Sequence, residues 1–560
     1  MPHWGIAMSI PLHAGPLRSR WILCFLAAVA VVVPAAVAAA PATAAPSASR
    51  STIAWVPCEQ VFFCTSVTVP LDYDHPAGRQ ISLALIKQPA TDPAHRIGSL
   101  FVNPGGPGGS GVDFVHDAGP ALFTPEVRAR FDIVGFDPRG IIRSTPLQCF
   151  DTEAQALAVV SPFPYPNTPR RTQVWIANEH KLDAACAARH AAIMNHMATA
   201  DAARDLDRLR QAVGDRALTY YGASYGSFLG NTYANLFPNK VRALVIDGVL
   251  DPVAWTTGRG DEGREVPFST RLHSAVGAQA TLKEFFRLCD AAGPNCAFAP
   301  HAARRYAQLY RALKDDPVSI ANPDGTTFQY DESFLIVDTL VTMYDSSSWP
   351  DFASFLADLE TRADASELAA RLSVLRQRTQ AVDYFNFLEG FPGVACSDSI
   401  NPTSYSAWTR AARASAGSDG LFGPIWTWVS SICADWPGHD SDRYLGPFTH
   451  RTSRPVLVVG NLFDPATPYR GAVTAARLLP NSALLTVHGW GHTSLFLSAC
   501  ADQAIGRYLL KSQTPPRGTV CEQDVVPFTQ PTKVSKAASS PAAATAVPNP
   551  GWSFYAGMSK

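Results

Sequence analysis

Short apolar runs, each bounded by glycine, proline or aspartate, recur along the chain. Runs of this kind are typical of strands that are buried on both faces of a parallel sheet. They lie at residues 99–103, 131–136, 217–221, 241–247, 455–460 and 483–487. A helical pattern over 199–213, with Thr199 as its expected N-cap, falls between the second run and the third. The alternation of strand and helix predicts a parallel α/β sheet.

The sequence predicts a hairpin before the alternating strands and helices, and a long helical segment that interrupts them. Alternating apolar positions at 64–69 and 81–85 predict an antiparallel hairpin ahead of the parallel strands. From about residue 250 to 451 amphipathic helical segments such as 302–314 and 366–384 replace the rhythm. Because strand-like runs resume afterwards, we expect a lid inserted between sheet strands rather than an independent second domain. This interpretation divides the core into residues 58–249 and 452–530, with the lid at 250–451.

Both ends of the chain differ in composition from this core. Arg18 and Arg20 precede the apolar run 21–33, and Ala42-Thr43-Ala44 follows it, which is the pattern of a cleaved secretory signal over residues 1–44. The apolar run is short for a bilayer span, so we expect export without a stable membrane anchor, to the medium, the periplasm or the cell envelope. Residues 45–57 are expected to be a linker, and the Ala/Ser/Pro-rich residues 531–560 a disordered tail.

Charge and cysteine content narrow the possible partners. The 560 residues carry a net charge of -1 with no basic block, which argues against nucleic acid and anionic membranes. Eleven cysteines, less Cys24 in the signal, leave ten, an even number that favours disulfides in an exported protein. The sequence contains no C-x-x-C cluster of the kind that would indicate a metal site. Sequence proximity suggests the pairs Cys58 with Cys64, Cys149 with Cys186, Cys289 with Cys296, Cys396 with Cys433, and Cys500 with Cys521.

The strand-like run that ends at Tyr221 leads into a turn that would expose a serine. Gly222 and Gly226 flank Ser224 in a Gly-x-Ser-x-Gly motif ahead of a helical segment. Such a motif occurs by chance in long chains, but a position between strand and helix is that of a nucleophile elbow. We therefore expect Ser224 to be the nucleophile of a covalent mechanism.

A serine hydroxyl becomes a good nucleophile only with a base and an acid that orients the base. In hydrolases with a nucleophile elbow the chain order is Ser, Asp or Glu, His. Downstream of Ser224, Asp464 follows one late apolar run and His492 follows the next. Asp247 is the alternative acid, and His488 is the alternative base. Chain order and loop position favour Asp464 and His492.

A glycine-rich loop, Asn-Pro-Gly-Gly-Pro-Gly-Gly-Ser-Gly, follows the first parallel run at residues 103–111. Acyl transfer needs N–H donors directed at the developing oxyanion, and Gly106 and Tyr225 are the candidates. A phosphate-binding loop would continue into Gly-Lys-Ser/Thr, and this one does not. Asp137 precedes the serine in the chain, so we expect it to be structural and to pair with Arg139 or cap a turn there.

With these residues in place, the chain resembles the secreted tripeptidyl aminopeptidases of actinobacteria and their relatives in the prolyl aminopeptidase family of α/β hydrolases. The matching segments are 69–73, 103–111, 135–140, 203–207, 221–226, 247–252, 464–468 and 491–492. The resemblance implies the α/β-hydrolase fold, a mostly parallel sheet flanked by helices with a large helical lid, and the triad Ser224, Asp464 and His492. Small prolyl aminopeptidases commonly begin the glycine loop with His-Gly-Gly and have Trp after the serine, whereas Pro104 and Tyr225 stand here. These departures favour the larger secreted branch over strict proline specificity.

The resemblance also implies an activity. It is that of a serine exopeptidase that releases tripeptides, similar short peptides or single residues from free N-termini through an acyl-enzyme, without metal or cofactor. An aminopeptidase needs a carboxylate for the substrate ammonium group, and Glu389 and Asp398 in the lid are the candidates. A carboxylesterase or lipase-like enzyme with the same triad, acting on small esters, is the alternative hydrolase. A catalytically inactive binding protein is the alternative outside enzymology.

Overall fold

A computed structural model describes residues 53–59, 61–189, 192–321, 326–375, 384 and 386–529. The expected signal peptide and the expected tail at 531–560 lie outside these residues, and so does most of the expected linker. Of the helix expected over 366–384, residues 365–375 form α14 (Ala365–Leu375), and residues 376–383 lie outside the described part.

A ten-stranded sheet forms the centre of the fold, in the order β1-β2-β3-β5-β4-β6-β7-β10-β11-β12. The first strands pair antiparallel, including the expected hairpin, and all pairs from β5 onward to β12 are parallel. The bounds are β1 (Val56–Pro57), β2 (Phe63–Pro70), β3 (Gln80–Gln88), β4 (Gly98–Asn103), β5 (Phe131–Phe136), β6 (Leu218–Ala223), β7 (Val241–Asp247), β10 (Val456–Phe463), β11 (Ser482–Trp490) and β12 (Val520–Glu522). Every residue of β4, β5 and β6 is buried, which explains why their sequences are mainly apolar without the alternation of a half-exposed strand.

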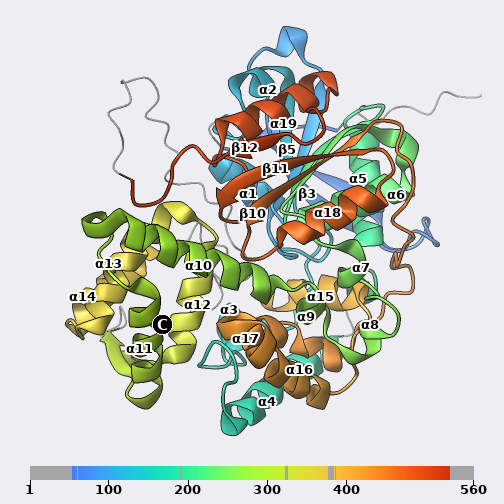
Figure 1. Ribbon diagram of the computed structural model, residues 1–560. Coiled ribbons are helices and arrows are strands. Elements are labelled where there is room, and N and C mark those ends of the chain that lie inside the picture. The colour runs from blue at the N-terminus through green and yellow to red at the C-terminus, as the bar shows by residue number, and fades with distance from the viewer. Residues whose placement is uncertain are drawn as a thin grey trace, which may run out of the picture. The chain divides into compact units, whose positions relative to one another are not determined.

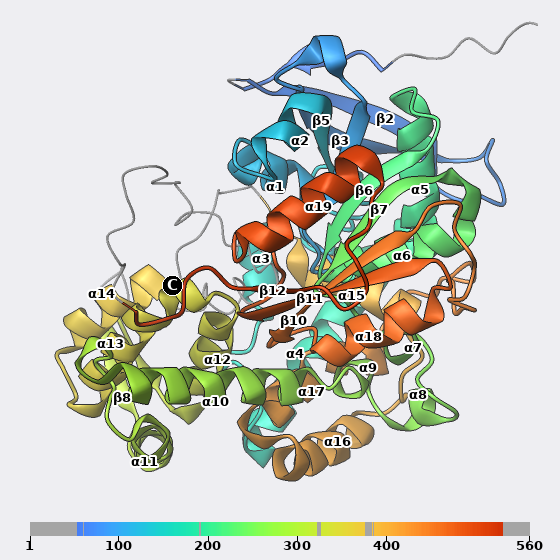
Figure 2. The same ribbon diagram turned by 45° about the horizontal axis from the view of Figure 1, so that its top comes forward.

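Helices cover both faces of this sheet (Figure 1 and Figure 2). One face packs on α1 (Gly111–Ala118), α2 (Pro125–Arg130) and α19 (Ala499–Lys511). The other packs on α5 (Thr199–Ala212), α6 (Tyr225–Leu236) and α18 (Tyr469–Leu478). Each face has its own buried apolar cluster, so the molecule has the layers of an α/β hydrolase.

The start of α5 differs from the prediction. Ala198 is the N-cap, and Thr199 is the first helical residue. Asp398 of the inserted region accepts hydrogen bonds from the Thr199 N–H at 2.7 Å and from its hydroxyl at 2.6 Å. The expectation that Thr199 caps its own helix was therefore wrong. The N–H group of this first helical residue has no partner within the helix, and the distant carboxylate of Asp398 bonds it instead.

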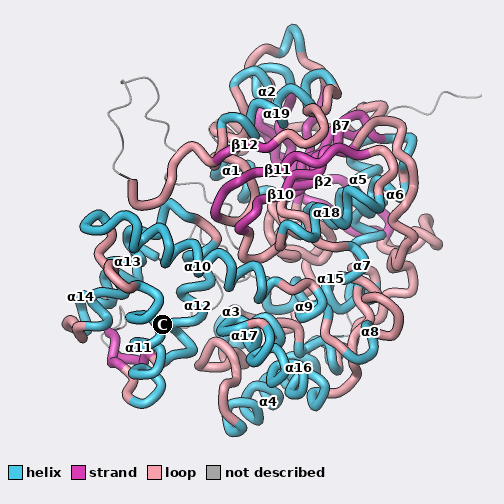
Figure 3. The backbone as a smooth tube through the Cα atoms, in the orientation of Figure 1, coloured by secondary structure: helices cyan, strands magenta, loops and turns pink. Residues whose placement is uncertain are grey.

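The segment between β7 and β10 is mainly helical and includes one small hairpin (Figure 3). Most of its elements between residues 274 and 434 share a third apolar cluster, which also includes Phe163 and Trp175 from the loop before α4 and from α4 itself. Residues 252–272 and 387–398 contribute instead to the cluster on the α5 and α6 face of the sheet. The bounds are α7 (Pro252–Trp255), α8 (Glu262–Glu265), α9 (Phe268–Arg271), α10 (Ser274–Ala292), α11 (Ala302–Asp315), β8 (Val318–Ala321), β9 (Thr327–Tyr330), α12 (Glu332–Met343), η5 (Ser346–Ser348), α13 (Trp349–Glu360), α14, α15 (Phe387–Asp398), α16 (Tyr405–Ser418), α17 (Gly423–Trp428) and η7 (Ser431–Ala434). Two more helices, α3 (Glu153–Leu157) and α4 (Pro169–Arg189), lie between β5 and α5.

Five disulfides join the cysteine pairs that sequence proximity suggests, 58–64, 149–186, 289–296, 396–433 and 500–521. The pair Cys396–Cys433 connects α15 to η7 within the lid, and Cys500–Cys521 connects α19 to β12. Within the part of the chain that the structure describes, no helix combines the length and the apolar character needed to cross a bilayer.

Candidate active site

The carboxyl ends of five neighbouring parallel strands meet at one edge of the sheet. The register pairs Asn103 with Gly222, Ala223 with Asp247, and Phe463 with Trp490. The glycine loop after β4, the serine after β6, the end of β7 and the loops after β10 and β11 therefore lie side by side. This edge is where open α/β sheets bind their ligands.

Ser224 occupies the strained turn between β6 and α6. Its φ of 56° and ψ of -124° are unusual for a residue with a side chain, and its N–H donates to the Asp247 carbonyl at 2.9 Å. A Cβ added at Gly222 would lie 2.1 Å from the Gly226 carbonyl oxygen, and one added at Gly226 would lie 2.7 Å from the Asn103 carbonyl oxygen. Only glycine fits at both positions, so the motif is required by the close packing of the turn.

The glycine loop packs directly on this turn. Gly105 has a φ of +102°, and a Cβ there would lie 2.7 Å from both the Ala223 carbonyl oxygen and the Ser224 Cβ. The same Cβ would lie 3.0 Å from the Tyr225 nitrogen. Tyr225 is the first residue of α6, so its N–H has no partner within the helix. The segment that carries Gly106 thus runs beside an available N–H group.

His492 pairs with Asp464. The imidazole Nδ1 lies 3.0 Å from each carboxylate oxygen of Asp464, and the two side chains are 7% and 0% exposed. Backbone N–H groups of Ala466 and Thr467 donate to Asp464 Oδ1 at 2.8 Å, and the Thr467 hydroxyl donates to Oδ2 at 2.9 Å. These donors fix the orientation of the carboxylate toward the imidazole.

The imidazole and the serine lie against the same two-residue segment, Asp247-Gly248. The Ser224 N–H is bonded to the Asp247 carbonyl, and a Cβ added at Gly248 would lie 3.2 Å from the His492 Cε1 atom. Gly248 has a φ of +62° and leaves this space open for the imidazole. The structure therefore brings Ser224, His492 and Asp464 together at one place on the sheet edge.

The alternative acid, Asp247, has different partners. Its Oδ2 accepts hydrogen bonds from the Tyr221 hydroxyl at 2.8 Å, the Ser494 N–H at 3.0 Å and the Ser494 hydroxyl at 2.6 Å. Burial raises the pKa of this carboxyl group. Asp247 thus binds the chain just beyond His492, and within the described part of the chain it forms no hydrogen bond with the imidazole itself.

The alternative base, His488, lies near the sheet edge strand. Its Nδ1 is 2.9 Å from the Glu522 carboxylate, and its side chain is 41% exposed. It is the third residue from the end of β11 and pairs with Glu522 of the edge strand β12, so its imidazole is engaged there and not at the serine turn.

The expected pair of Asp137 with Arg139 is wrong. Asp137 accepts hydrogen bonds from the Ser110 hydroxyl at 2.5 Å and the Val112 N–H at 3.2 Å, and so orients the start of α1. Arg139 instead forms a buried ion pair with Asp205 of α5 at 2.6 Å. The rest of the expectation holds, because Asp137 is structural and also accepts the Arg143 N–H at 3.2 Å in the turn that follows it. Only Arg139 pairs with a segment that the local pattern does not indicate.

Two residues that the sequence interpretation missed support the histidine loop. Thr467 contacts both members of the acid-base pair, since its hydroxyl lies 3.3 Å from His492 Nδ1 as well as 2.9 Å from Asp464. The Asn461 side-chain amide donates to the carbonyls of Gly491, at 3.0 Å, and Thr493. The Asp-x-x-Thr spacing, a common local capping pattern, could have indicated Thr467. Nothing local indicates Asn461.

The two lid carboxylates considered for amine binding differ in how fully they are bonded. Asp398 accepts from the Thr199 N–H and hydroxyl and from the Trp255 indole N–H at 3.1 Å, which occupies both of its oxygens. Glu389 Oε1 accepts from the Tyr384 hydroxyl and the Cys149 N–H. Its Oε2 is buried and has no hydrogen-bond partner among the described residues. Burial raises the pKa of Glu389 to about 7.

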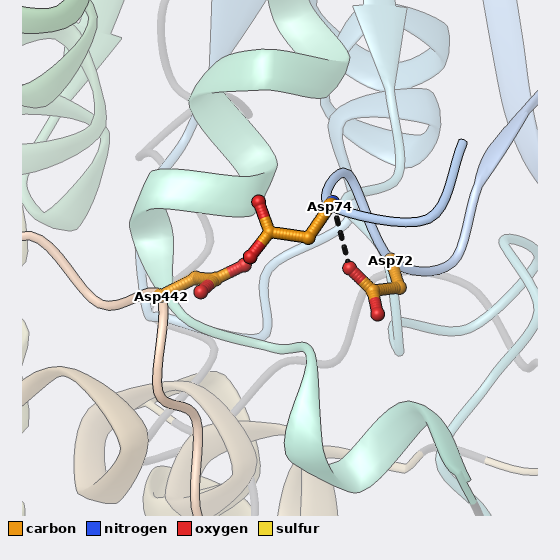
Figure 4. Close-up of side chains that lie close together, drawn as sticks. All are labelled: Asp72, Asp74 and Asp442. Atoms are coloured by element: carbon orange, nitrogen blue, oxygen red, sulfur yellow. Dashed lines mark hydrogen bonds between the residues drawn. The ribbon is translucent and has the colours of Figure 1, made fainter.

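Two other features lie apart from the catalytic residues. The carboxylates of Asp72, Asp74 and Asp442 gather beside the first hairpin (Figure 4), and one oxygen from each lies within 4.8 Å of the others. Asp72 already accepts the Asp74 N–H at 2.8 Å and contacts the His75 ring, so the cluster is explained by its own turn. A groove of about 740 Å³ lies among α4, α11, α12 and α16 of the described chain, and none of the triad residues lines it.

Comparison with known proteins agrees with this geometry. Residues 98–271 match the model of the alpha/beta hydrolase fold, and residues 419–521 match the model of the TAP-like protein family. Serine protease Hip1 of Mycobacterium tuberculosis is 32% identical over 503 residues, covering 84% of this chain and 91% of that protein. Tripeptidyl aminopeptidase of Streptomyces lividans is 30% identical, covering 87% and 89%. Carboxylesterase B of Mycobacterium tuberculosis is 31% identical, covering 82% and 86%.

Proposed function

This chain belongs to the tripeptidyl aminopeptidase-like family of α/β hydrolases, and from that premise we propose that it is an exported serine exopeptidase that releases tripeptides or similarly short peptides from free N-termini. The observation that carries the proposal is the His492–Asp464 pair, 3.0 Å apart, beside a serine held at a positive φ. Five disulfides fit an oxidising compartment, which supports export by a cleaved signal peptide at residues 1–44.

In the proposed mechanism Ser224 Oγ attacks the scissile carbonyl carbon while His492 Nε2 takes its proton. Asp464 accepts a hydrogen bond from Nδ1–H and keeps the imidazole in the tautomer that can act as a base. The N–H groups of Gly106 and Tyr225 bind the oxyanion of the tetrahedral intermediate. The C–N bond then breaks, His492 returns the proton to the leaving amine, and a water molecule hydrolyses the acyl-enzyme by the same steps.

An exopeptidase must also hold the substrate ammonium group, and we assign this role to Glu389 before Asp398. Glu389 keeps one oxygen for a new partner, whereas both oxygens of Asp398 are occupied. Phe387 and Phe391 lie against Gly108 of the glycine loop, and Glu389 lies on the opposite face of α15. An ammonium group would therefore reach it around the N-terminal end of α15, past the Tyr384 hydroxyl.

Two measurements test the proposal. A fluorophosphonate probe should label the wild-type protein and fail to label Ser224→Ala, and equal labelling of the variant would exclude Ser224 as nucleophile. The protein should also cleave tripeptide p-nitroanilides with a free N-terminus much faster than the same compounds with an acetylated N-terminus.

The similarity to a protein named carboxylesterase supports a second candidate, an esterase with the same triad. Simple p-nitrophenyl esters decide between the two functions. If these esters and the acetylated peptides were cleaved as fast as the free tripeptides, the exopeptidase function would be wrong and the esterase function would replace it.

A further inference from the structure

The loop that carries His492 is joined to the lid through main-chain atoms. The His492 N–H donates to the Tyr344 carbonyl at 2.9 Å, and Asp345 forms an antiparallel bridge with Gly491. Gly491 has a φ of +132°, and a Cβ there would lie 2.8 Å from the Tyr344 carbonyl oxygen. The lid chain after α12 therefore pairs with the histidine loop at a distance that only glycine allows.

The side chain of Tyr344 makes a second contact with the same residue. Its ring meets the His492 imidazole edge to face, with ring centroids 5.0 Å apart and planes at 72°. This is a favoured geometry for two aromatic rings. Because the His492 side chain is only 7% exposed, the Tyr344 ring is part of the wall that separates the imidazole from water.

Two more connections, one direct and one through Gln523, join the end of β11 to the lid. The Trp490 indole N–H donates to Glu284 of α10 at 2.9 Å. Gln523 accepts the Trp490 N–H at 2.8 Å and donates to the Ser346 hydroxyl at 2.9 Å. The strand that leads to His492 is thus held from two lid segments, α10 and residues 344–346.

Tyr344 itself stands at the end of a rigid element. The preceding helix, α12, is buried along almost all of its length, and Met343 is fully buried in the lid core. The Trp349 indole N–H donates to the Thr342 carbonyl at 3.2 Å and closes the turn that follows the helix. The backbone that carries the Tyr344 ring is therefore held in place by the lid core.

We propose that Tyr344 is a positioning residue for the general base, so that the lid sets the rate of the chemical step as well as covering the site. The inference rests on the role proposed for His492. Asp464 and Thr467 restrain the imidazole at Nδ1, and the Tyr344 carbonyl holds its backbone. The Tyr344 ring adds a contact on the imidazole itself that opposes its movement away from Ser224. A general base must stay within hydrogen-bond reach of the proton it removes.

The test compares Tyr344→Ala with Tyr344→Phe. Removal of the ring should lower kcat on a free tripeptide p-nitroanilide by about 10- to 100-fold, the loss expected when a reacting group is misplaced by about 1 Å. KM should change by less than about twofold, because the substitution displaces the general base and does not alter substrate binding. Tyr344→Phe keeps the ring and should retain at least half of the wild-type kcat. Tyr310→Ala, which removes a lid tyrosine that lines the separate groove, serves as the matched control and should keep the wild-type kcat.

Fluorophosphonate labelling rates separate this inference from the proposed peptidase function. Labelling needs only the serine and its base, so Tyr344→Ala should label more slowly by a similar factor even if esters prove to be the better substrates. The inference is wrong if Tyr344→Ala keeps the wild-type kcat, if its loss lies in KM alone, or if Tyr344→Phe loses as much as Tyr344→Ala. If the alanine variant melts below the assay temperature, Tyr344→Leu keeps the apolar volume without the aromatic edge and is judged by the same criteria.

Discussion

Replacing Asp464 or Asp247 by asparagine should reveal which carboxylate is the triad acid. In Asp464→Asn one oxygen becomes an NH2 group. The backbone N–H groups of Ala466 and Thr467, both 2.8 Å from Oδ1, keep the remaining oxygen at that position. The NH2 group then replaces Oδ2, 3.0 Å from His492 Nδ1, and presents a donor where an acceptor is needed.

Oδ1 also lies 3.0 Å from Nδ1, but it already accepts two backbone N–H groups, so the new donor favours the imidazole tautomer that carries its proton on Nε2. In that tautomer the ring cannot accept the proton of Ser224, and the base is lost even though the geometry is intact. The equivalent change in a serine protease lowers kcat by about 10⁴-fold, which corresponds to about 5 kcal/mol of transition-state stabilisation. We expect a loss of this order in Asp464→Asn.

Asp247→Asn is the matched control, because this carboxyl group is equally buried on the same sheet edge. All three of its donors, the Tyr221 hydroxyl and the N–H and hydroxyl of Ser494, bind Oδ2, so the amide oxygen can replace that atom. The NH2 group takes the place of Oδ1, which has no partner among the described residues. An unsatisfied buried group costs about 1–3 kcal/mol of stability, whereas kcat should fall by less than about tenfold.

The assay is kcat on a free tripeptide p-nitroanilide, with the fluorophosphonate labelling rate as a second readout and thermal melting to verify folding. Measurements at a temperature well below both melting points keep stability out of the comparison. The assignment would be reversed if kcat of Asp247→Asn fell by more than about 1000-fold, as expected for the triad acid, while kcat of Asp464→Asn stayed within about tenfold of wild type. Similar losses in both variants would refute the hydrogen-bond argument itself.

Three further predictions follow from the lid and the elbow. Because burial raises the pKa of Glu389 to about 7, the carboxyl group is neutral at lower pH and cannot pair with an ammonium group. KM for free tripeptides should therefore fall as pH rises from 6 to 7.5. Glu389→Gln should raise KM and remove its dependence on pH. A pH-independent KM in the wild type would exclude Glu389. Gly105→Ala places a methyl group 2.7 Å from the Ser224 Cβ and should lower kcat by about 100-fold; near-wild-type turnover would contradict the close packing. The double change Cys396→Ala and Cys433→Ala opens a loop with a sequence separation of 37 and should lower the free energy of unfolding by about 2–4 kcal/mol, measured by urea denaturation, and an unchanged value would show that this disulfide does not stabilise the lid.

The strands were predictable because each is buried on both faces. The run 131–136 matches β5 at both ends, and 217–221 differs from β6 (Leu218–Ala223) by one residue at its start and two at its end. Such strands are mainly apolar along their whole length, so their limits can be read from the local sequence. The triad candidates could be found for the same reason. Ser224 and Asp464 stand directly after a strand and His492 two residues after one, and parallel strands bring their carboxyl ends to one edge.

Pairings of polar groups could not be predicted in the same way. Thr199 looked like a helix cap, yet its N–H is bonded by Asp398, 199 residues away. Asp137 and Arg139 looked like a pair, yet Arg139 bonds Asp205 across a separation of 66 residues. A charged side chain has many chemically acceptable partners, and only the folded chain decides which of them is near.

The lid contacts of His492 affect catalysis but could not be predicted from the local sequence pattern. The position of the histidine is encoded by β11, which immediately precedes it, but the groups that hold the loop come from far along the chain: Tyr344 is 148 residues before His492, and Glu284 is 206 residues before Trp490. A lid that only admitted substrate would affect KM. Because lid groups accept hydrogen bonds from the histidine loop and from Trp490 just before it, substitutions in the lid core should change kcat through Tyr344. Variation in the lid should therefore alter the rate of acylation together with the choice of substrate.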